Sequence, residues 1–539
     1  MQYRLTRAFL NLLSFPLIHI AIDAGIVLNA RDPIAAVPMR FLFEQAALLS
    51  QPYVLMHHRY PTAFELTAFV GSNLILSIVV LIGWWVILSA LILRIARLIL
   101  EKLPLRLHHY VIGGVGLVLC LTLWSALQNS VPDQITIDLR QQETPFSSHF
   151  SFSQGGESQM RDPGYFETAM QTLSSLHPRY VRIDHIFDYY DVAHPLPDGS
   201  VSYQWEQLDR VVTAIRDSGA EPFISLSYMP TWLALGGDNY APPTDFQVWE
   251  EMVYQTVEHL NGERGFGIRY WEVWNEPNLQ AFWHGSLDQF LQLYGASSRG
   301  VRRADPSALV GGAGFSSENR WGDAFSLFYE RSWAAALMND ARENALPLDF
   351  LSWHLYETDP QRFVDSAAAH QSWVQGIDPT PELLITEWNA DAAYNPIYDD
   401  GRTNAFAAAV IGELSNTSIS EAFYFEPSDG GIQFEGRWGL MDANGTPKPV
   451  LQVFEAIARL NGTQLSAQSS RTETGAIAVL NENHDVELVV WNQADSDRTI
   501  EVTITNGAQN RLQTVVVSAH DITTLTLHTA DLYENLNPA

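Results

Sequence analysis

The chain has 539 residues with 61 acidic and 31 basic side chains, and its formal net charge of -30 argues against nucleic-acid binding, which needs a basic surface. Hydrophobic residues make up 47% and charged residues 17%, which excludes a wholly disordered chain, and the length suggests about three domains. The single cysteine, Cys120, excludes an internal disulfide framework and a zinc site built from several cysteines.

Three apolar segments in the first 132 residues predict transmembrane helices. Segments 66–93 and 110–132 contain no charged residue, and each is longer than the ~20 residues that a helix needs to cross the hydrocarbon core. Segment 8–30 contains His19 and Asp23, and it is an uncleaved signal anchor, a spanning helix or an interfacial helix. A cleaved signal peptide is not expected, because further apolar segments follow and no small-residue cleavage site stands out.

The basic residues near these segments predict the orientation of the chain in the membrane. The loop between 66–93 and 110–132 contains four of them: Arg94, Arg97, Lys102 and Arg106. Positive charge close to the ends of a span marks the cytoplasmic side, and Arg4 and Arg7 place the amino terminus there as well. We therefore expect a multi-pass protein of the cell membrane, with segment 31–65 and everything after about residue 133 outside the cytoplasm.

From about residue 140 to 460, short apolar runs alternate with amphipathic stretches. Strands are expected at 150–152, 180–183, 222–226, 270–274, 308–312, 349–353, 383–386 and 422–425. Helices are expected at 205–218, 246–260, 287–303, 324–337 and 403–414. Eight strands, each followed by a helix, predict an α/β fold, namely a (β/α)8 TIM barrel. An open doubly wound sheet is the alternative, but no glycine-rich phosphate loop follows the first strand.

The region 462–530 has an all-β pattern. Short β-branched runs, separated by Asn, Asp, Ser and Gly, occur at 476–479, 486–491, 499–504, 512–517 and 522–527. They predict a β-sandwich accessory domain. Such a small domain buries little core alone, so we expect it to pack against the barrel.

Two glutamates stand at the ends of predicted barrel strands. The sequence WEVWNEPN at 271–278 ends the fourth strand, and TEW at 386–388 ends the seventh. Because the carboxyl ends of barrel strands meet at one face, Glu276 and Glu387 are expected to face one pocket, with Glu272 as a structural partner deeper in the barrel. A glycosidase needs such a pair: an acid that protonates the leaving oxygen and an ionised carboxylate on the other face of the sugar. This mechanism needs no metal or cofactor, and no closely spaced His pair stands among the candidate site residues.

These motifs resemble those of the family 39 glycoside hydrolases, a family of the large clan of retaining barrel enzymes that includes β-xylosidases, α-iduronidases and exopolysaccharide-cluster hydrolases. The resemblance covers about residues 145–460 and extends into the all-β region. It implies that Glu276 is the acid/base, that Glu387 is the nucleophile, and that Asn275 hydrogen-bonds the sugar 2-hydroxyl or its equivalent.

Further residues match the family's pattern. His354 and Tyr356 occupy its His-x-Tyr motif on the sixth strand, which implies that Tyr356 hydrogen-bonds Glu387 as a carboxylate. Tyr228 in Tyr-Met-Pro and the segments 437–440 and 447–449 also match, and the resemblance implies that Tyr228, His354 and Tyr356 contact the substrate. One segment departs: the family commonly has Tyr-Trp-x-x-Ser-Asp on the eighth strand, whereas this chain has YFEPSD at 424–429. Phe425 replaces the family's tryptophan and lacks its indole N–H, and Glu426 adds a carboxyl. These differences leave open which sugar is bound, but they do not change the expected reaction.

Other side chains are candidates for substrate contacts or support. Arg182 and Asp184 share one face of the second strand and predict an internal ion pair that supports Glu387. His185 either contacts a sugar hydroxyl or is a packed loop residue. Four tryptophans are either platforms for sugar rings or core residues: Trp232, Trp283, Trp353 and Trp388.

The sequence as a whole predicts a membrane-anchored retaining glycoside hydrolase that acts outside the cytoplasm on a polysaccharide or oligosaccharide, with an exopolysaccharide as the favoured substrate. The expected partners are the carbohydrate, the lipid bilayer and proteins of polysaccharide synthesis or export. Three alternatives remain open: a non-hydrolytic carbohydrate-binding or scaffold subunit of such a complex, a transglycosylase, and an exo-acting β-xylosidase.

Overall fold

The computed structural model of the chain describes residues 132–146, 150–156, 163–317, 323–429, 436–442 and 444–534. All of them belong to one unit, Val131–Ala539. The predicted transmembrane segments 8–30, 66–93 and 110–132 lie outside these residues, except for Pro132, and so does Cys120. Within the described part of the chain, no helix is both long enough and apolar enough to cross a bilayer.

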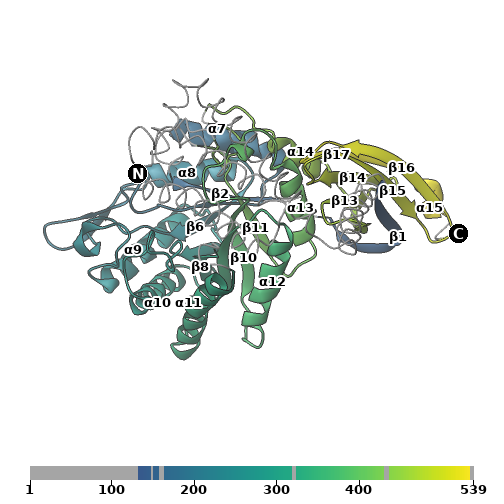
Figure 1. Cartoon of the computed structure of the whole chain (residues 1–539). Coiled ribbons are helices and arrows are strands. Elements are labelled where there is room, and N and C mark those ends of the chain that lie inside the picture. The colour runs from purple at the N-terminus through teal and green to yellow at the C-terminus, as the bar shows by residue number, and fades with distance from the viewer. Residues whose placement is uncertain are drawn as a thin grey trace, which may run out of the picture. The chain divides into compact units, whose positions relative to one another are not determined.

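Eight parallel strands form a closed barrel, which confirms the predicted fold and all eight predicted strands (Figure 1). In chain order they are β2 (Ser151–Gln154), β3 (Tyr180–Ile183), β6 (Glu221–Leu226), β7 (Tyr270–Val273), β8 (Leu309–Ser316), β9 (Phe350–Tyr356), β10 (Glu382–Asn389) and β11 (Glu421–Phe425). The barrel closes where β11 pairs with β2. A small hairpin of β4 (Ala193–Pro195) and β5 (Val201–Tyr203) follows β3.

A helix follows each barrel strand. The eight helices are α7 (Pro163–Leu173), α8 (Glu206–Asp217), α9 (Phe246–Val257), α10 (Leu287–Ala304), α11 (Asp323–Glu343), α12 (Gln361–Val374), α13 (Asn404–Leu414) and α14 (Leu451–Ala458). The five predicted helices are confirmed, whereas α7, α12 and α14 were not identified from the sequence. In α8, buried Leu208, Val211 and Ile215 recur at helical spacing, so one face packs on the barrel. A capping box between Ser286 and Gln289 begins α10.

The interior of the barrel changes from aromatic to polar along the strands. The layer near the amino-terminal ends of the strands consists of Tyr180, Phe223, Tyr270, Phe350, Leu384 and Phe423. Alternate residues of a strand face the same side, so the next layer comes two positions later: Arg182, Ser225, Glu272, Ser352, Thr386 and Phe425. Polar and charged side chains therefore fill the barrel toward its carboxyl-terminal face, where the predicted catalytic residues lie.

The carboxy-terminal region forms one continuous seven-stranded sheet rather than the two separate sheets of the predicted sandwich. Its strands, in spatial order, are β16 (Asn510–Val517), β15 (Arg498–Thr505), β1 (Asp133–Pro145), β12 (Thr463–Ser469), β13 (Thr474–Leu480), β14 (Asp485–Asn492) and β17 (Asp521–His528). The short helix α15 (Ala530–Glu534) follows β17.

The strand β1 precedes the barrel in sequence but lies in the middle of this sheet, in blue beside the yellow strands (Figure 1). It pairs parallel with β15 and antiparallel with β12. Its alternating residues Ile135, Ile137 and Leu139 are all fully buried in the core of the sheet. The strands β12 to β17 lie within the predicted accessory region 462–530, but the predicted barrel start at residue 140 is too early, because the apolar alternation of β1 belongs to the accessory sheet.

The sheet packs against the barrel through α13, as expected for a domain with a small core. The N–H of Ala405 donates to the carbonyl of His520 at 3.1 Å, and Asn404 Nδ2 donates to Asp521 Oδ1 at 2.9 Å. A methyl group at Gly412 would lie 3.1 Å from the ring of Trp491, so a glycine allows this close approach.

Removal of β1 should destabilise the protein. We expect a chain that begins at residue 146 to unfold at a clearly lower denaturant concentration than one that begins at residue 132. It loses three buried side chains worth ~1.5–3 kcal/mol each and opens the edges of β12 and β15. Urea unfolding followed by tryptophan fluorescence measures this difference. Thr136→Ser, on the exposed side of β1, is the matched control, and equal midpoints for the two lengths would contradict the assignment of β1 to this sheet.

Candidate active site

Arg182 on β3 connects the polar side chains inside the barrel. It is fully buried. Its Nε donates to Glu272 Oε2 at 2.7 Å, its Nη1 to Glu387 Oε1 and Ser153 Oγ at 3.0 Å, and its Nη2 to Asn275 Oδ1 at 2.7 Å. Burial opposes the charged form, but the carboxylates of Glu272 and Glu387 outweigh it and raise the pKa of Arg182, so the guanidinium stays charged.

Glu272 on β7 is the structural partner that the sequence predicts. It is fully buried, and besides Arg182 it receives hydrogen bonds at Oε1 from Ser352 Oγ at 2.6 Å and Thr386 Oγ1 at 2.9 Å. Ser352 lies on β9 and Thr386 on β10. One carboxylate thus connects β3, β7, β9 and β10 directly below the predicted catalytic residues.

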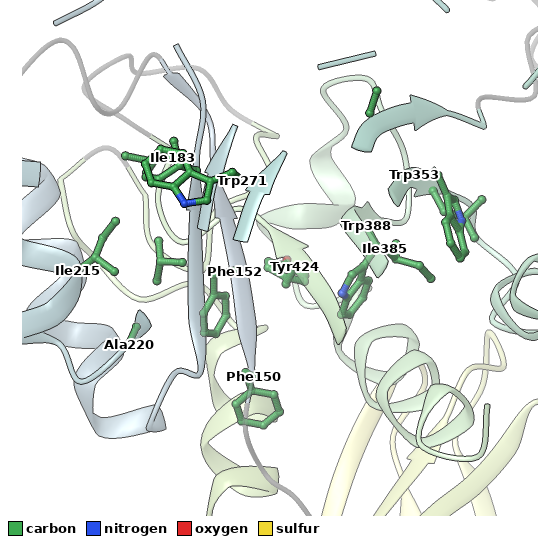
Figure 2. Packing of buried hydrophobic residues seen from close by; sticks show 14 of the residues in the cluster. Phe150, Phe152, Ile183, Ile215, Ala220, Trp271, Trp353, Ile385, Trp388 and Tyr424 are labelled. Atoms are coloured by element: carbon green, nitrogen blue, oxygen red, sulfur yellow. The ribbon is translucent and has the colours of Figure 1, made fainter. Parts of the chain in front are cut away.

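A β-bulge in β10 turns Glu387 into the barrel. The pairing of β10 with β9 shifts register between Ile385 and Glu387. Thr386 and Glu387 therefore both reach interior partners, although they are adjacent in sequence. Ile385 and Trp388 face the helices instead, and Figure 2 shows both among buried core side chains.

Asn275 and Glu276 follow the end of β7 in a strained backbone segment. Trp274 and Glu276 have φ angles of 71° and 48°, in the left-handed region that side chains other than glycine rarely adopt. Asn275 Nδ2 donates to Tyr228 Oη at 2.7 Å, and the N–H of Glu276 donates to the carbonyl of Gly314 at 3.1 Å. These contacts fix the direction in which both side chains leave the backbone.

His354 on β9 lies between the two glutamates. Its Nδ1 is 2.9 Å from Glu276 Oε1 and 3.3 Å from Glu387 Oε2. Burial lowers the pKa of His354, which favours the neutral ring, although Glu387 opposes this change. Its Nε2 is buried, and the described residues offer it no hydrogen-bond partner. A proton on Nδ1 leaves no buried donor unpaired, so we assign the neutral tautomer in which Nδ1 donates to the glutamates.

Glu387 is buried, with 7% exposure, and its ionised form depends on donors. Burial raises the pKa of Glu387, and Arg182 counteracts this rise. Tyr356 Oη donates to Glu387 Oε2 at 2.8 Å, which is the hydrogen bond that the sequence predicts. The two donors favour a carboxylate at this position. Asn275, Glu276, His354 and Tyr356 are thus brought together around Glu387.

Three predicted substrate contacts are occupied by core packing instead. Trp388 is buried with its ring near Phe363, Phe406 and Tyr424, because it is on the outer face of β10. Trp283 is 1% exposed and donates its Nε1–H to the carbonyl of Ser286 at 3.0 Å. Tyr228 is 1% exposed, and its hydroxyl accepts from Asn275, so it supports that residue rather than a sugar. The aromatic composition of these segments did not reveal which rings point inward.

The second strand also differs from the prediction in detail. Arg182 forms salt bridges with Glu272 and Glu387, as expected for support of Glu387, whereas among the described residues Asp184 acts on it only at longer range, through its charge. His185 stacks on Tyr189 with ring centroids 3.9 Å apart, and its Nδ1 lies 2.8 Å from Asp188 Oδ2. These contacts hold the partly exposed ring of His185 in place, and its contact with a sugar hydroxyl stays a prediction. Among the described residues, no group of three His, Cys, Asp or Glu side chains is arranged to hold a metal ion.

The structure adds two features of the site: the sequence did not reveal the role of Gly314, and it identified Glu426 as an additional carboxyl without its partners. Gly314 has a φ of 55°, and a methyl group there would lie 2.8 Å from His354 Nε2, so this glycine lets His354 reach the glutamates. Glu426 is 1% exposed and accepts from Gln154 Nε2 at 2.8 Å and from the N–H of Gly155 at 3.2 Å. Its carboxylate is therefore bound within the barrel wall. The glycine-rich sequence from Gly311 to Gly314 was the signal from which the role of Gly314 could have been predicted.

The fold and the site define a (β/α)8 barrel with a buried glutamate pair at the carboxyl-terminal ends of its fourth and seventh strands. The sequence profile of the family described as "Glycosyl hydrolases family 39" matches residues 135–516. The chain therefore belongs to this family of glycoside hydrolases. The resemblance seen in the sequence motifs is confirmed at this level.

Individual relatives agree with this assignment. The chain is 27% identical over 330 residues to a β-xylosidase of Caldicellulosiruptor saccharolyticus, which covers 55% of this chain and 64% of the relative. It is 26% identical over 334 residues to a β-xylosidase of Geobacillus stearothermophilus, which covers 54% of this chain and 62% of the relative. The chain thus spans less than two thirds of the length of these curated relatives. The crystal structure of a family 39 enzyme from Xanthomonas axonopodis pv. citri has the same fold, with a TM-score of 0.58 at 18% identity over 74% of this chain and 95% of that one.

Removal of the Tyr356 hydroxyl should shift the pH dependence of the enzyme. Burial already raises the pKa of Glu387, and Tyr356→Phe removes a donor that stabilises its ionised form. The sequence motifs imply that Glu387 is the nucleophile, which must be ionised to react, so we expect activity to be lost as pH falls through this pKa. We expect the acid limb of kcat/KM to move to higher pH by about one unit.

The measurement is a pH profile of aryl glycoside cleavage by wild type and Tyr356→Phe. Tyr294→Phe is the matched control, because its buried hydroxyl donates at 2.7 Å to the carbonyl of Pro347 and does not contact the glutamates. An acid limb that stays in place, or that moves to lower pH, would show that Tyr356 does not stabilise the carboxylate.

Proposed function

We propose that this protein is a retaining glycoside hydrolase, with Glu387 as the nucleophile and Glu276 as the acid/base. The observation that carries this proposal is the position of His354 Nδ1, 2.9 Å from one carboxylate and 3.3 Å from the other. Because both distances start from the same nitrogen, Glu276 Oε1 and Glu387 Oε2 cannot be farther apart than the sum of 2.9 and 3.3 Å, which is 6.2 Å. Retaining enzymes hold their carboxyl groups ~5–5.5 Å apart, whereas inverting enzymes need ~6.5–9.5 Å to admit a water molecule.

The reaction proceeds in two displacements. In the first, Glu387 attacks the anomeric carbon while Glu276 gives its proton to the leaving glycosidic oxygen. The resulting glycosyl ester removes the negative charge of Glu387. Glu276, now a carboxylate, takes a proton from water as the water attacks the anomeric carbon, and Glu387 leaves as a carboxylate. Like charges this close disfavour double ionisation, which suits a pair that holds one proton at the start.

The substrate that we propose is a polysaccharide or oligosaccharide that the enzyme meets at the external surface of the cell membrane, with an exopolysaccharide as the favoured class. The support is the apolar segments 66–93 and 110–132 with the basic loop between them, because spans at these segments would anchor the chain with the catalytic domain outside the cytoplasm. Nascent polymers emerge at this surface, so export proteins are the expected neighbours.

A second candidate is an exo-acting β-xylosidase. It is favoured by two curated relatives that are named β-xylosidases. A transglycosylase, in which a second sugar replaces water, uses the same glutamates. Product analysis with an added acceptor sugar distinguishes it from a hydrolase, and shortening of a polymer from within distinguishes endo action from exo action.

The two glutamate variants should fail differently. We expect Glu387→Ala to lose turnover on every substrate, because no covalent intermediate forms. Glu276→Ala should still form the intermediate from aryl glycosides with good leaving groups, and azide should accelerate its breakdown. Chromatography and NMR of the glycosyl azide give its configuration. An azide of inverted configuration from Glu276→Ala, or rescue of Glu387→Ala alone, would reverse the assignment.

The proposed orientation has its own test. Reporter fusions after residue 104 and after residue 146 should report opposite compartments, with the first in the cytoplasm and the second outside. The junction at 146 lies after β1, so the fusion does not divide a strand. A cytoplasmic signal from the fusion at 146 would contradict the orientation and leave the catalytic assignment intact.

A further inference from the structure

Four aromatic rings follow one another from the nucleophile to the protein surface, and we call them the aromatic strip: Tyr356, Phe425, Trp438 and Tyr394. Tyr356 contacts Glu387 through its hydroxyl. Its ring centroid is 6.2 Å from that of Phe425, which is 5.3 Å from that of Trp438, which is 5.0 Å from that of Tyr394. The strip joins the ends of β9 and β11 to the loop after β10.

The aromatic strip is partly open to solvent, unlike the tryptophans that proved to be core. Tyr394 is 50% exposed, and among the large hydrophobic side chains that are exposed in the described residues it is the single aromatic one. Tyr356, Phe425 and Trp438 are half-buried. Trp388, by contrast, is 2% exposed. Tyr394 is connected to Tyr356 through two intervening rings, and a continuous aromatic path that is partly open to solvent suits a ligand-binding surface.

Hydrogen bonds hold the strip in place. Trp438 Nε1 donates to the carbonyl of Asp391 at 2.8 Å, and the N–H of Asn395 donates to the carbonyl of Gly436 at 2.8 Å. These bonds tie the loop that carries Tyr394 to the segment that carries Trp438. Rings fixed before a ligand arrives lose little conformational freedom on binding.

The charge beneath the rings is compensated. Arg437 is 3% exposed, and its guanidinium carbon lies 5.4 Å from the ring centroid of Tyr394 and 5.7 Å from that of Trp438. Its Nη2 is 3.8 Å from Oε1 of Glu426. The strip therefore offers apolar faces above a paired charge, which suits a neutral ligand better than an anionic one.

We infer that the aromatic strip binds sugar units beyond the one attacked by Glu387, so that neutral chains of three or more units are preferred over disaccharides; this inference rests on the proposed function. The C–H faces of a sugar ring are apolar and pack on aromatic faces, while its hydroxyl groups remain at the edges for polar partners. Two polar side chains lie beside the rings, Asp391 and Asn395, and they hydrogen-bond each other, with Asn395 Nδ2 donating to Asp391 Oδ2 at 3.1 Å. Trp438 and Tyr394 are then residues that determine specificity for chain length.

The test compares cleavage of neutral oligosaccharides of two to five units by the full chain. The probes are the β-linked xylose, glucose and mannose series, and product release is followed by chromatography. For the series that wild type cleaves, we expect kcat/KM to rise with chain length. Tyr394→Ala should lower the ratio of kcat/KM for five units to that for two by about 2- to 10-fold, because one stacking partner is lost.

Two further variants make the result specific. Tyr394→Phe keeps the ring and should keep the ratio. Tyr533→Ala removes a ring that stacks on His484 in the carboxy-terminal sheet, with centroids 4.0 Å apart, and should also keep the ratio. A ratio that Tyr394→Ala leaves unchanged, or that Tyr533→Ala lowers equally, overturns the inference alone. Wild type that cleaves none of the series overturns the proposed function on these sugars and the inference with it.

Discussion

The buried ion pair between Arg182 and Glu272 is the interaction on which the site depends. Both side chains are fully buried, so their charges are tolerable only with complete hydrogen bonding. Glu272 receives additional donors from Ser352 and Thr386, and Arg182 gives its remaining N–H groups to Ser153, Asn275 and Glu387. Loss of one partner of such a pair typically costs ~3–5 kcal/mol. The pair fixes the orientation of the site from below.

Local departures from regular strand geometry then bring the functional side chains to this platform. The bulge in β10 lets Thr386 bind Glu272 while the next residue, Glu387, binds Arg182. The left-handed backbone at Trp274 and Glu276 does the same at the end of β7. Regular alternation would have turned one of each adjacent pair outward. The strain is tolerated because interior hydrogen bonds over-determine these positions.

The sequence was sufficient for the features that depend on periodicity and on motif chemistry. Eight apolar runs predicted the eight strands, and Asn-Glu and Thr-Glu at two of their ends predicted which carboxylates meet. The sequence was insufficient where a single inserted residue in a strand decides whether a side chain faces the barrel interior or the surrounding helices. Trp388 lies beside Glu387 yet points outward, and the bulge that decides this has no signature in residue type. The alternation of Ile135, Ile137 and Leu139 was not identified as a strand, and its pairing with β12 and β15 joins segments more than 300 residues apart.

The same platform accounts for the different roles that we propose for the two glutamates. Burial raises the pKa of Glu387, and a charged guanidinium that donates to one of its oxygens opposes this rise, while a phenol donates to the other. Glu276 faces Nδ1 of His354, whose lowered pKa favours a neutral ring that gives one hydrogen bond without a full positive charge. The carboxylate beside the permanent charge is the better nucleophile, and the one beside the neutral ring can hold a proton for the leaving oxygen. Since Glu272 compensates part of the charge of Arg182, it also limits how strongly Glu387 is stabilised. A carboxylate that is stabilised too strongly as an ion is a poor nucleophile. Glu272, the counter-ion of Arg182, would therefore affect the reactivity of Glu387 as well as the stability of the fold.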